Sequence, residues 1–246
     1  MPFFINFRVQ LHRMRFLNIL FFVFALNAFS QEKLPLTVRD TTFYTKVDSL
    51  YREDQFYLSI TYNLFQQKPQ SLSQNGFSTG LSIGFLRDMP INKKRTVAIA
   101  AGLGLSYNKY HQNLLVTETN GNANYEILED VSYDRNKMEQ VFLEVPIEFR
   151  WRNSTIQSHK FWRIYTGFKV RYLILDKTKF VGETTITVFN NKDFDKIQYG
   201  PYIAFGYNTW NFHAYYGLNP LFKSAEMNGD KIKMTTLNIG LMFYVL

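Results

Sequence analysis

The sequence predicts an all-β protein, a single transmembrane antiparallel up-and-down β-barrel of eight strands. Three observations predict this fold. Apolar and polar side chains alternate along eight segments, as they do in strands whose successive side chains point to opposite faces. Short and long connections alternate between these segments, as in barrels that cross a membrane. Beyond the N-terminal region no stretch is apolar enough for a transmembrane helix, and only helices and closed barrels satisfy their backbone groups in lipid.

The clearest pattern lies in two neighbouring segments, 140–152 and 161–174, which we interpret as a hairpin in the barrel wall. One face of the first segment is apolar: Val141, Leu143, Val145, Ile147, Phe149 and Trp151. The other face carries most of its charges: Glu144, Glu148, Arg150 and Arg152. The second segment repeats this division, with Arg163, Lys169 and Arg171 on its polar face. Each strand therefore has one face suited to lipid and one suited to a polar interior.

The remaining predicted strands span 56–65, 77–88, 97–107, 197–208, 212–219 and 235–246. The connections after the second, fourth and sixth strands are short, and the others are longer. In outer-membrane barrels the short turns are periplasmic and the long loops external. A ten-stranded barrel is the alternative, if residues 178–189 fold separately.

Alternation alone also fits a secreted soluble barrel, but two features favour a membrane. The polar faces of several strands are mostly Gly, Ala, Ser and Tyr, which suit the narrow interior of an eight-stranded barrel. Trp151, Trp162 and Trp210 fall at the same predicted rim, as in an aromatic girdle at a membrane–water interface. The other half of the girdle is assigned to a second set of aromatic residues: Tyr107, Tyr172, Tyr199 and Phe222.

The two ends of the chain carry patterns typical of exported outer-membrane proteins. Arg13, Arg15 and the apolar run 17–28 predict a signal peptide over residues 1–30, followed by a periplasmic segment, 31–55, and the barrel, 56–246. At the C-terminus, Asn238, Gly240, Phe243 and Val245 resemble the assembly signal of outer-membrane proteins. The expected partners are outer-membrane lipid, the barrel assembly machinery through this last strand, and an envelope protein.

Composition excludes several classes of function. The chain has no cysteine, which excludes disulfides and thiolate sites. The net charge of +8 is spread among acidic residues and forms no basic stripe, so we expect no nucleic-acid partner. His159 lies in a predicted short turn, His213 faces inward, and His111, at the far end of the third strand, has no Ser–Asp partner nearby in the sequence. We therefore expect no enzymatic activity, no cofactor and no metal.

The charged inner face is the strongest candidate site, a lumen network of Glu144, Glu148, Arg150, Arg163, Lys169 and Arg171. If Trp151 faces Trp162 across the hairpin, Glu144 lies opposite Lys169, and Arg150 lies opposite Arg163. Two functions remain open for this network. It can plug a lumen too narrow for a channel, or Glu144 and Glu148 can relay protons or ions.

Four segments resemble the PorT-like outer-membrane β-barrel proteins of Bacteroidota: 85–95 (FLRDMPINKKR), 143–155 (LEVPIEFRWRNST), 161–173 (FWRIYTGFKVRYL) and 207–223 (YNTWNFHAYYGLNPLFK). The resemblance covers most of 56–246 and implies a porin-family barrel in the outer membrane of a Gram-negative bacterium. It implies no catalytic residue. It further implies a role as a structural or secretion-associated component (type IX), with a small passive transport or proton-relay barrel as the alternative.

The two longest connections are predicted to continue as paired strands beyond the membrane. The turn residues Asn120-Gly121-Asn122 lie midway between the third and fourth strands, and residues 182–185 lie midway between the fifth and sixth. Residues with β propensity flank both tips. We expect two neighbouring external hairpins that rise by roughly 30–40 Å.

Overall fold

The computed structural model describes residues 54–74, 76–153 and 161–245. The predicted signal peptide, 1–30, lies outside these residues, as do most of the segment 31–55 and the last residue, Leu246. Within the described part, no helix is long and apolar enough to cross a membrane.

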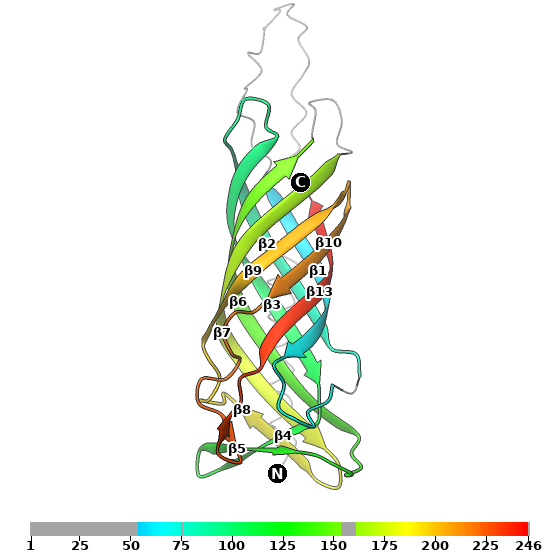
Figure 1. Ribbon diagram of the computed structural model, residues 1–246, viewed down its shortest axis with the longest axis vertical. Coiled ribbons are helices and arrows are strands. Elements are labelled where there is room, and N and C mark those ends of the chain that lie inside the picture. Colours follow the sequence, from blue (N-terminus) through cyan, green and yellow to red (C-terminus); the bar gives the residue numbers. More distant parts are fainter. Residues whose placement is uncertain (1–53, 75, 154–160, 246) are drawn as a thin grey trace, which may run out of the picture. The chain divides into compact units, whose positions relative to one another are not determined.

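Eight antiparallel strands close into a barrel, which confirms the predicted fold (Figure 1). They are β1 (Gln55–Gln66), β2 (Thr79–Pro90), β3 (Val97–His111), β6 (Arg135–Arg152), β7 (Trp162–Val181), β9 (Ile197–Tyr207), β10 (Trp210–Tyr216) and β13 (Thr235–Val245). Each strand pairs with the next along the barrel, and β13 pairs with β1. The ten-stranded alternative is wrong, because β7 runs on through Thr178 to Val181 and pairs there with both β6 and β8.

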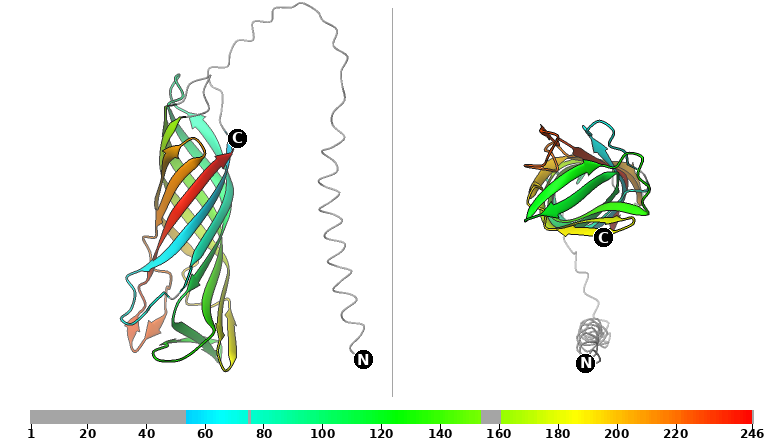
Figure 2. Two further views of the ribbon diagram at one scale, coloured as in Figure 1. Left: turned by 90° about the vertical axis from the view of Figure 1, so that its right-hand side faces the viewer. Right: turned by 90° about the horizontal axis from the view of Figure 1, so that it is seen from below.

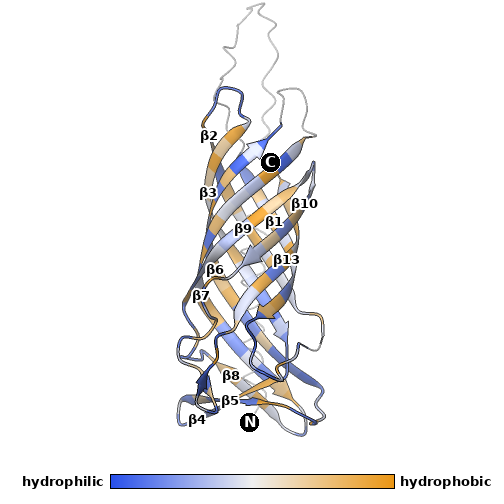
Figure 3. Cartoon of the chain, in the orientation of Figure 1, coloured by the Kyte–Doolittle hydropathy of each residue, from blue (hydrophilic) through white to orange (hydrophobic). Residues whose placement is uncertain are grey.

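The predicted alternation separates the wall from the lumen. Ile147 and Phe149 are 54% and 49% exposed, whereas Glu148 and Arg150 between and beside them are at most 1% exposed. Exposed apolar residues recur along the outside of all eight strands. The hydropathy colouring shows apolar and polar residues mixed along the barrel strands (Figure 3). The wall is thus apolar outside and mostly polar inside, the reverse of a soluble barrel.

Glycines on two adjacent strands make room for one large lumen side chain. A Cβ at Gly84 would collide with the ring of Tyr57, and a Cβ at Gly104 would collide with its hydroxyl. Tyr57 is 2% exposed and reaches across the interior towards β6. The small residues of β2 and β3 therefore fit the cramped interior that the sequence predicts.

The two ends of the barrel differ. At the short-turn end the connections are 91–96, 153–161 and 208–209. At the opposite end, the loop end, the connections contain five further strands: β4 (Leu114–Thr119), β5 (Asn122–Ile127), β8 (Thr185–Phe189), β11 (Glu226–Met227) and β12 (Asp230–Lys231). Asn120-Gly121 and Asn228-Gly229 turn the two separate hairpins with positive φ at both residues, the geometry of tight hairpin turns.

The two predicted external hairpins are present but continue differently. β7 and β8 extend the barrel wall, with β6 paired alongside as far as Arg135, as predicted. β4 and β5 instead pair only with each other and lie across the barrel opening (Figure 2, right). The prediction that this first hairpin also rises from the wall is wrong. Its apolar side chains, including Leu114 and Val116, become buried only when it folds over the opening.

Candidate functional site: a lumen closed at two levels

The register of the β6–β7 hairpin differs by two residues from the predicted one. Trp151 lies opposite Ile164, not Trp162, so Glu144 lies opposite Arg171 and Arg150 lies opposite Tyr165. The prediction assumed that two tryptophans at one rim must be paired. Instead, the residue pair nearest the turn is Arg152 opposite Arg163. A shift of two keeps every side chain on its predicted face while it changes each partner.

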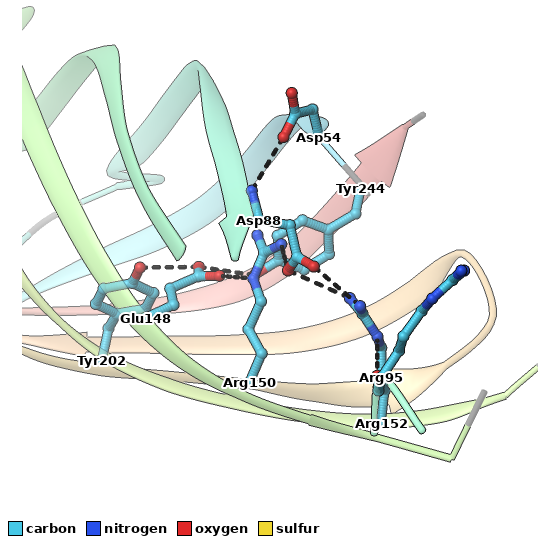
Figure 4. A network of polar contacts seen from close by, with 8 residues as sticks. All are labelled: Asp54, Asp88, Arg95, Glu148, Arg150, Arg152, Tyr202 and Tyr244. Carbon is cyan, nitrogen blue, oxygen red and sulfur yellow. Dashed lines mark hydrogen bonds and ion pairs between the residues drawn. The ribbon is translucent and has the colours of Figure 1, made fainter. Parts of the chain in front are cut away.

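Asp88 is the centre of an ionic cluster near the short-turn end (Figure 4). Arg150 donates from Nη1 to Asp88 Oδ1 at 2.8 Å, and Arg152 donates from Nη2 to Asp88 Oδ2 at 2.9 Å. Arg152 also donates to the Arg95 carbonyl at 2.9 Å. All three ion-pair side chains have no exposed side-chain surface. Two arginines of β6 are thus tied to the end of β2 across β3.

Glu148 extends this cluster across the lumen. Its Oε2 accepts a 2.7 Å hydrogen bond from Arg150 Nε, and its Oε1 accepts hydrogen bonds from Tyr202 at 2.8 Å and Tyr244 at 3.2 Å. Tyr202 comes from β9 and Tyr244 from β13, so the carboxylate connects β6 to the far side of the barrel (Figure 4). A buried carboxylate with this many donors is well compensated for its loss of hydration.

Aromatic rings pack against the arginines of this ionic cluster. Tyr165 and Tyr244 pack edge to face with ring centroids 5.2 Å apart, and Arg150 Cζ lies 4.8 Å from the Tyr165 ring. Arg163 Cζ lies 4.6 Å from the Phe161 ring, and Arg163 forms no described ion pair. Of the six predicted network residues, Arg163 is therefore held by aromatic faces instead of a carboxylate.

A second ionic cluster lies nearer the middle of the barrel. Glu144 Oε1 is 3.1 Å from Lys169 Nζ and accepts a 2.7 Å hydrogen bond from the Tyr57 hydroxyl. Arg171 donates to Gln198 and Thr236, and its Cζ lies 4.1 Å from the Tyr215 ring. Glu144 and Lys169 are paired although they are not directly opposite, because Lys169 reaches diagonally from its place opposite Pro146.

Sequence reasoning missed Asp88, which accepts more arginine contacts than either predicted glutamate. Asp88 lies on the same face of β2 as Gly80, Ser82 and Gly84, so the alternation that placed those residues inside also places it there. The even spacing of Asp88 from these three residues is the sequence signal that places it in the lumen. The described lumen then holds three carboxylates, Asp88, Glu144 and Glu148, and five cations, Arg150, Arg152, Arg163, Lys169 and Arg171.

The loop end is closed by an apolar cluster. We call this cluster, together with the loops and hairpins that form it, the cap. Its buried members come from strand ends and from loops: Phe65, Leu72, Tyr110, Leu114, Met138, Phe142, Leu173, Phe194, Leu221, Phe222, Ala225, Ile232 and Met234. Phe65 stacks on Tyr110 at 4.4 Å, and Phe194 stacks on Phe222 at 4.6 Å. The assignment of Phe222 to the outer girdle is wrong, since it is 4% exposed within this cluster.

Polar contacts tie the β4–β5 hairpin to the rest of the cap. Tyr125 donates to Asp193 Oδ2 at 2.9 Å and accepts from Asn191 Nδ2 at 2.8 Å. Asp176 Oδ2 accepts from the Asn191 backbone N–H at 2.8 Å. Burial raises the pKa of Asp176, although that hydrogen bond and Lys196 act against the rise. Burial likewise raises the pKa of Tyr125. Asn136 Nδ2 also donates to the Leu114 carbonyl at 2.9 Å, so polar contacts hold the hairpin at both of its strands, above the apolar cluster.

The predicted rim and terminal residues lie on the outer wall and the last strand. Trp151, Trp162 and Trp210 are 43%, 59% and 65% exposed at the short-turn end. Tyr107, Tyr172 and Tyr199 are also exposed, nearer the loop end. The four residues predicted as the assembly signal all lie in β13, which pairs with both β1 and β10: Asn238, Gly240, Phe243 and Val245.

The histidines do not gather at one place. His213 is 2% exposed in the lumen with its ring edge-on to Tyr202, His111 lies at the loop end of β3, and His159 lies outside the described residues. Among residues 54–74, 76–153 and 161–245, no group of three His, Asp or Glu side chains is arranged to hold a metal ion.

One comparison with known proteins, the family model, agrees with this architecture. The family model described as "Outer membrane protein beta-barrel domain" matches residues 29–223. No curated protein matches the chain. Similar solved structures include one titled "Asymmetric conductivity of engineered proteins" and a double mutant of Rh. blastica porin, each 9% identical over 79% of this chain and 100% of theirs. Their TM-scores of 0.20 and 0.21 are too low to carry an argument.

Proposed function

Because the chain belongs to the outer membrane protein β-barrel domain family, we propose that it is a non-conducting, non-enzymatic outer-membrane barrel that works through its folded cap. The observation that carries this proposal is the double closure of the lumen. Ionic clusters fill its short-turn half, and apolar side chains seal its loop end. A solute would have to displace both, which is unlike the open lumen of a channel.

The membrane orientation follows from the asymmetry of the connections. Short turns are periplasmic and long loops external in bacterial barrels, so we place the cap outside the cell. Trp151, Trp162 and Trp210 then mark the periplasmic interface, and Tyr107, Tyr172 and Tyr199 mark the outer one. On this orientation β13 ends at the periplasmic rim, where the barrel assembly machinery would read Asn238, Gly240, Phe243 and Val245.

The finer role that we propose is a structural or secretion-associated envelope component, as the resemblance to PorT-like proteins of Bacteroidota suggests. Two surfaces are available to an envelope partner: the external cap and the short periplasmic turns. The cap carries far more ordered surface, with four strands besides the barrel wall, β4, β5, β11 and β12. We therefore expect the partner contact at the cap.

A planar-bilayer recording of the purified, folded protein tests the closed-lumen proposal. We expect no steady conductance above that of an empty bilayer, with a known open porin as the positive control. The alternative function, a small passive transport or proton-relay barrel, requires a steady ion or proton current. Such a current, if it scaled with the number of inserted barrels, would overturn the proposal.

Site-specific crosslinking in the native membrane tests the proposed partner surface. A photoreactive residue is placed at Lys223, exposed in the cap, or at Lys94, exposed in the short turn 91–96. The proposal predicts a discrete crosslinked product from position 223 and none from position 94. Crosslinks from position 94 alone would show that the partner binds the short turns instead of the cap.

A further inference from the structure

A cleft opens in the surface of the cap between three loops that are distant in the sequence. It has a volume of about 780 Å³. Its walls are the β1–β2 loop (residues 67–71), the end of the β4–β5 hairpin with Glu129, and the β11–β12 hairpin with residues 232–233. Drug-sized ligands occupy pockets of roughly 300–1,000 Å³. The cleft is therefore large enough for a ligand of several linked rings.

The charged groups that line this cleft are balanced and unpaired with one another. Three are cationic and three are anionic: Lys68, Lys231, Lys233, Glu126, Glu129 and Asp230. No side chain of these six takes part in an ion pair or hydrogen bond within the described residues, although both signs occur in one cleft. The amides of Gln67, Gln70 and Asn228 add further donors and acceptors. Their hydrogen-bonding capacity remains available to a ligand.

The base of the cleft is apolar. Ile127, Met227 and Tyr125 belong to the apolar edge of the cap cluster, and Ile232 is 3% exposed within it. The walls are turns: Gln67, Ser71 and Asn228 have positive φ values of 52°, 67° and 54°. The cleft thus has polar walls built from turns above a packed apolar base.

From this lining we propose that the cleft binds a neutral oligosaccharide of about two to four sugar units. Sugar hydroxyls both donate and accept hydrogen bonds, so carboxylates can accept from them, ammonium groups can donate to them, and amides can do both. A lining with no net charge gives no preference to an anion or a cation. The C–H faces of the rings would lie on the apolar base. The proposal rests on the proposed function, in which the cap faces the exterior.

Calorimetric titration of the full-length folded barrel tests this proposal. The protein is kept in lauryldimethylamine oxide, because maltoside and glucoside detergents would compete for the cleft. The probes are the tetrasaccharides of glucose and of N-acetylglucosamine, the acidic tetragalacturonate, and the zwitterionic peptide Lys-Glu-Lys-Glu. We expect at least one neutral saccharide to bind with a Kd on the order of 1 mM or below, and the charged probes to bind roughly ten-fold more weakly.

Matched variants locate the binding. Lys231→Met and Glu126→Gln each remove one charged hydrogen-bonding group from the cleft, and each should weaken saccharide binding roughly ten-fold. Lys223→Met removes an exposed lysine of the cap that does not line the cleft, and it should leave binding unchanged. These side chains are exposed, so none of the changes should prevent folding.

Three results would overturn the proposal. They are no binding of either neutral saccharide, equal binding by the Lys231→Met and Lys223→Met variants, or a preference for the peptide or the acidic saccharide. A negative titration would not affect the conductance result, and a steady conductance would not affect the titration. The failure of the saccharide site and the failure of the closed-lumen function are thus distinguishable.

Discussion

The lumen and the cap close the same barrel by opposite chemistry. In the lumen, charged side chains such as Asp88 and Arg150 have no exposed surface and form ion pairs with each other. In the cap, Phe194, Phe222 and their neighbours exclude water through apolar contact. A buried ion pair depends on each partner, because the loss of one leaves an uncompensated charge. An apolar cluster loses stability in smaller steps, in proportion to the volume removed.

This difference predicts how each region should fail. Damage to a lumen ion pair should lower the stability of the whole barrel, since the pair joins strands across the interior. Damage to the cap should loosen the loops while the wall remains paired, since the β4–β5 hairpin is hydrogen-bonded as a separate sheet. The predictions below test this contrast.

The largest effect is expected from Asp88→Ala. It leaves Arg150 and Arg152 without their shared carboxylate and should lower the free energy of unfolding by about 3–5 kcal/mol. Urea unfolding of the barrel in lipid vesicles measures this loss. Asp134→Ala, at an exposed acidic position before β6, is the control and should change stability by no more than about 0.5 kcal/mol. A loss below about 1 kcal/mol for Asp88→Ala would mean that water replaces the carboxylate.

The sequence predicted the wall far better than the contacts inside it. The eight strands follow from a two-residue period that lipid on one side and a narrow lumen on the other impose throughout. The partners of Arg150 and Arg163 could not be predicted, because register depends on the geometry of the turn that joins β6 and β7. Alternation specifies only the face on which a side chain lies.

The closure of the loop end by the cap was not predicted, although the β4–β5 hairpin within it was, and the physical reason is different. Several of its apolar residues, such as Leu72, Phe194 and Leu221, lie in connections without a repeating period. Nothing in their local sequence distinguishes a residue that folds inward from one that joins the aromatic girdle, as the error at Phe222 shows. Long-range packing alone decides their place.

The next effect concerns the cap. Phe222→Ala removes a ring that stacks on Phe194 and contacts Tyr125, and it should destabilise the cap by about 3 kcal/mol. Amide exchange should accelerate in β4, β5, β11 and β12 while the amides of β1 and β13 remain protected. Phe189→Ala is the control, since that ring is 57% exposed. Equal acceleration in the barrel wall would show that cap and wall unfold together.

A smaller effect is expected from the pair Glu144 and Lys169. Lys169→Ala should destabilise the barrel less than Asp88→Ala, because Glu144 keeps its hydrogen bond from Tyr57. The double variant Glu144→Gln with Lys169→Met should recover part of the loss, with a coupling of about 0.5–3 kcal/mol in urea unfolding. Additive losses in the single and double variants would show that the two groups do not interact.

The smallest effect is a pH dependence of the cap. The pKa of Asp176 is raised in the folded state, so the folded cap binds a proton more readily than the open one. Its stability should therefore fall as the pH rises from about 4 through the raised pKa. The protection factor of the Asn191 backbone amide, measured as a function of pH, reports this change. The variant Asp176→Asn should show a smaller dependence on pH. An unchanged slope in that variant would assign the dependence to another group.

The most direct test of the double closure removes the hairpin that lies across the barrel opening. In a barrel whose residues 114–127 are replaced by a short Gly-Ser linker, the β4–β5 hairpin is absent but the ionic clusters of Asp88, Glu148 and Glu144 remain. Planar-bilayer recordings of this variant should show no steady conductance, as for the complete protein. A steady, ohmic conductance that appears when the hairpin is removed would show that the lumen is an open passage closed by the hairpin alone.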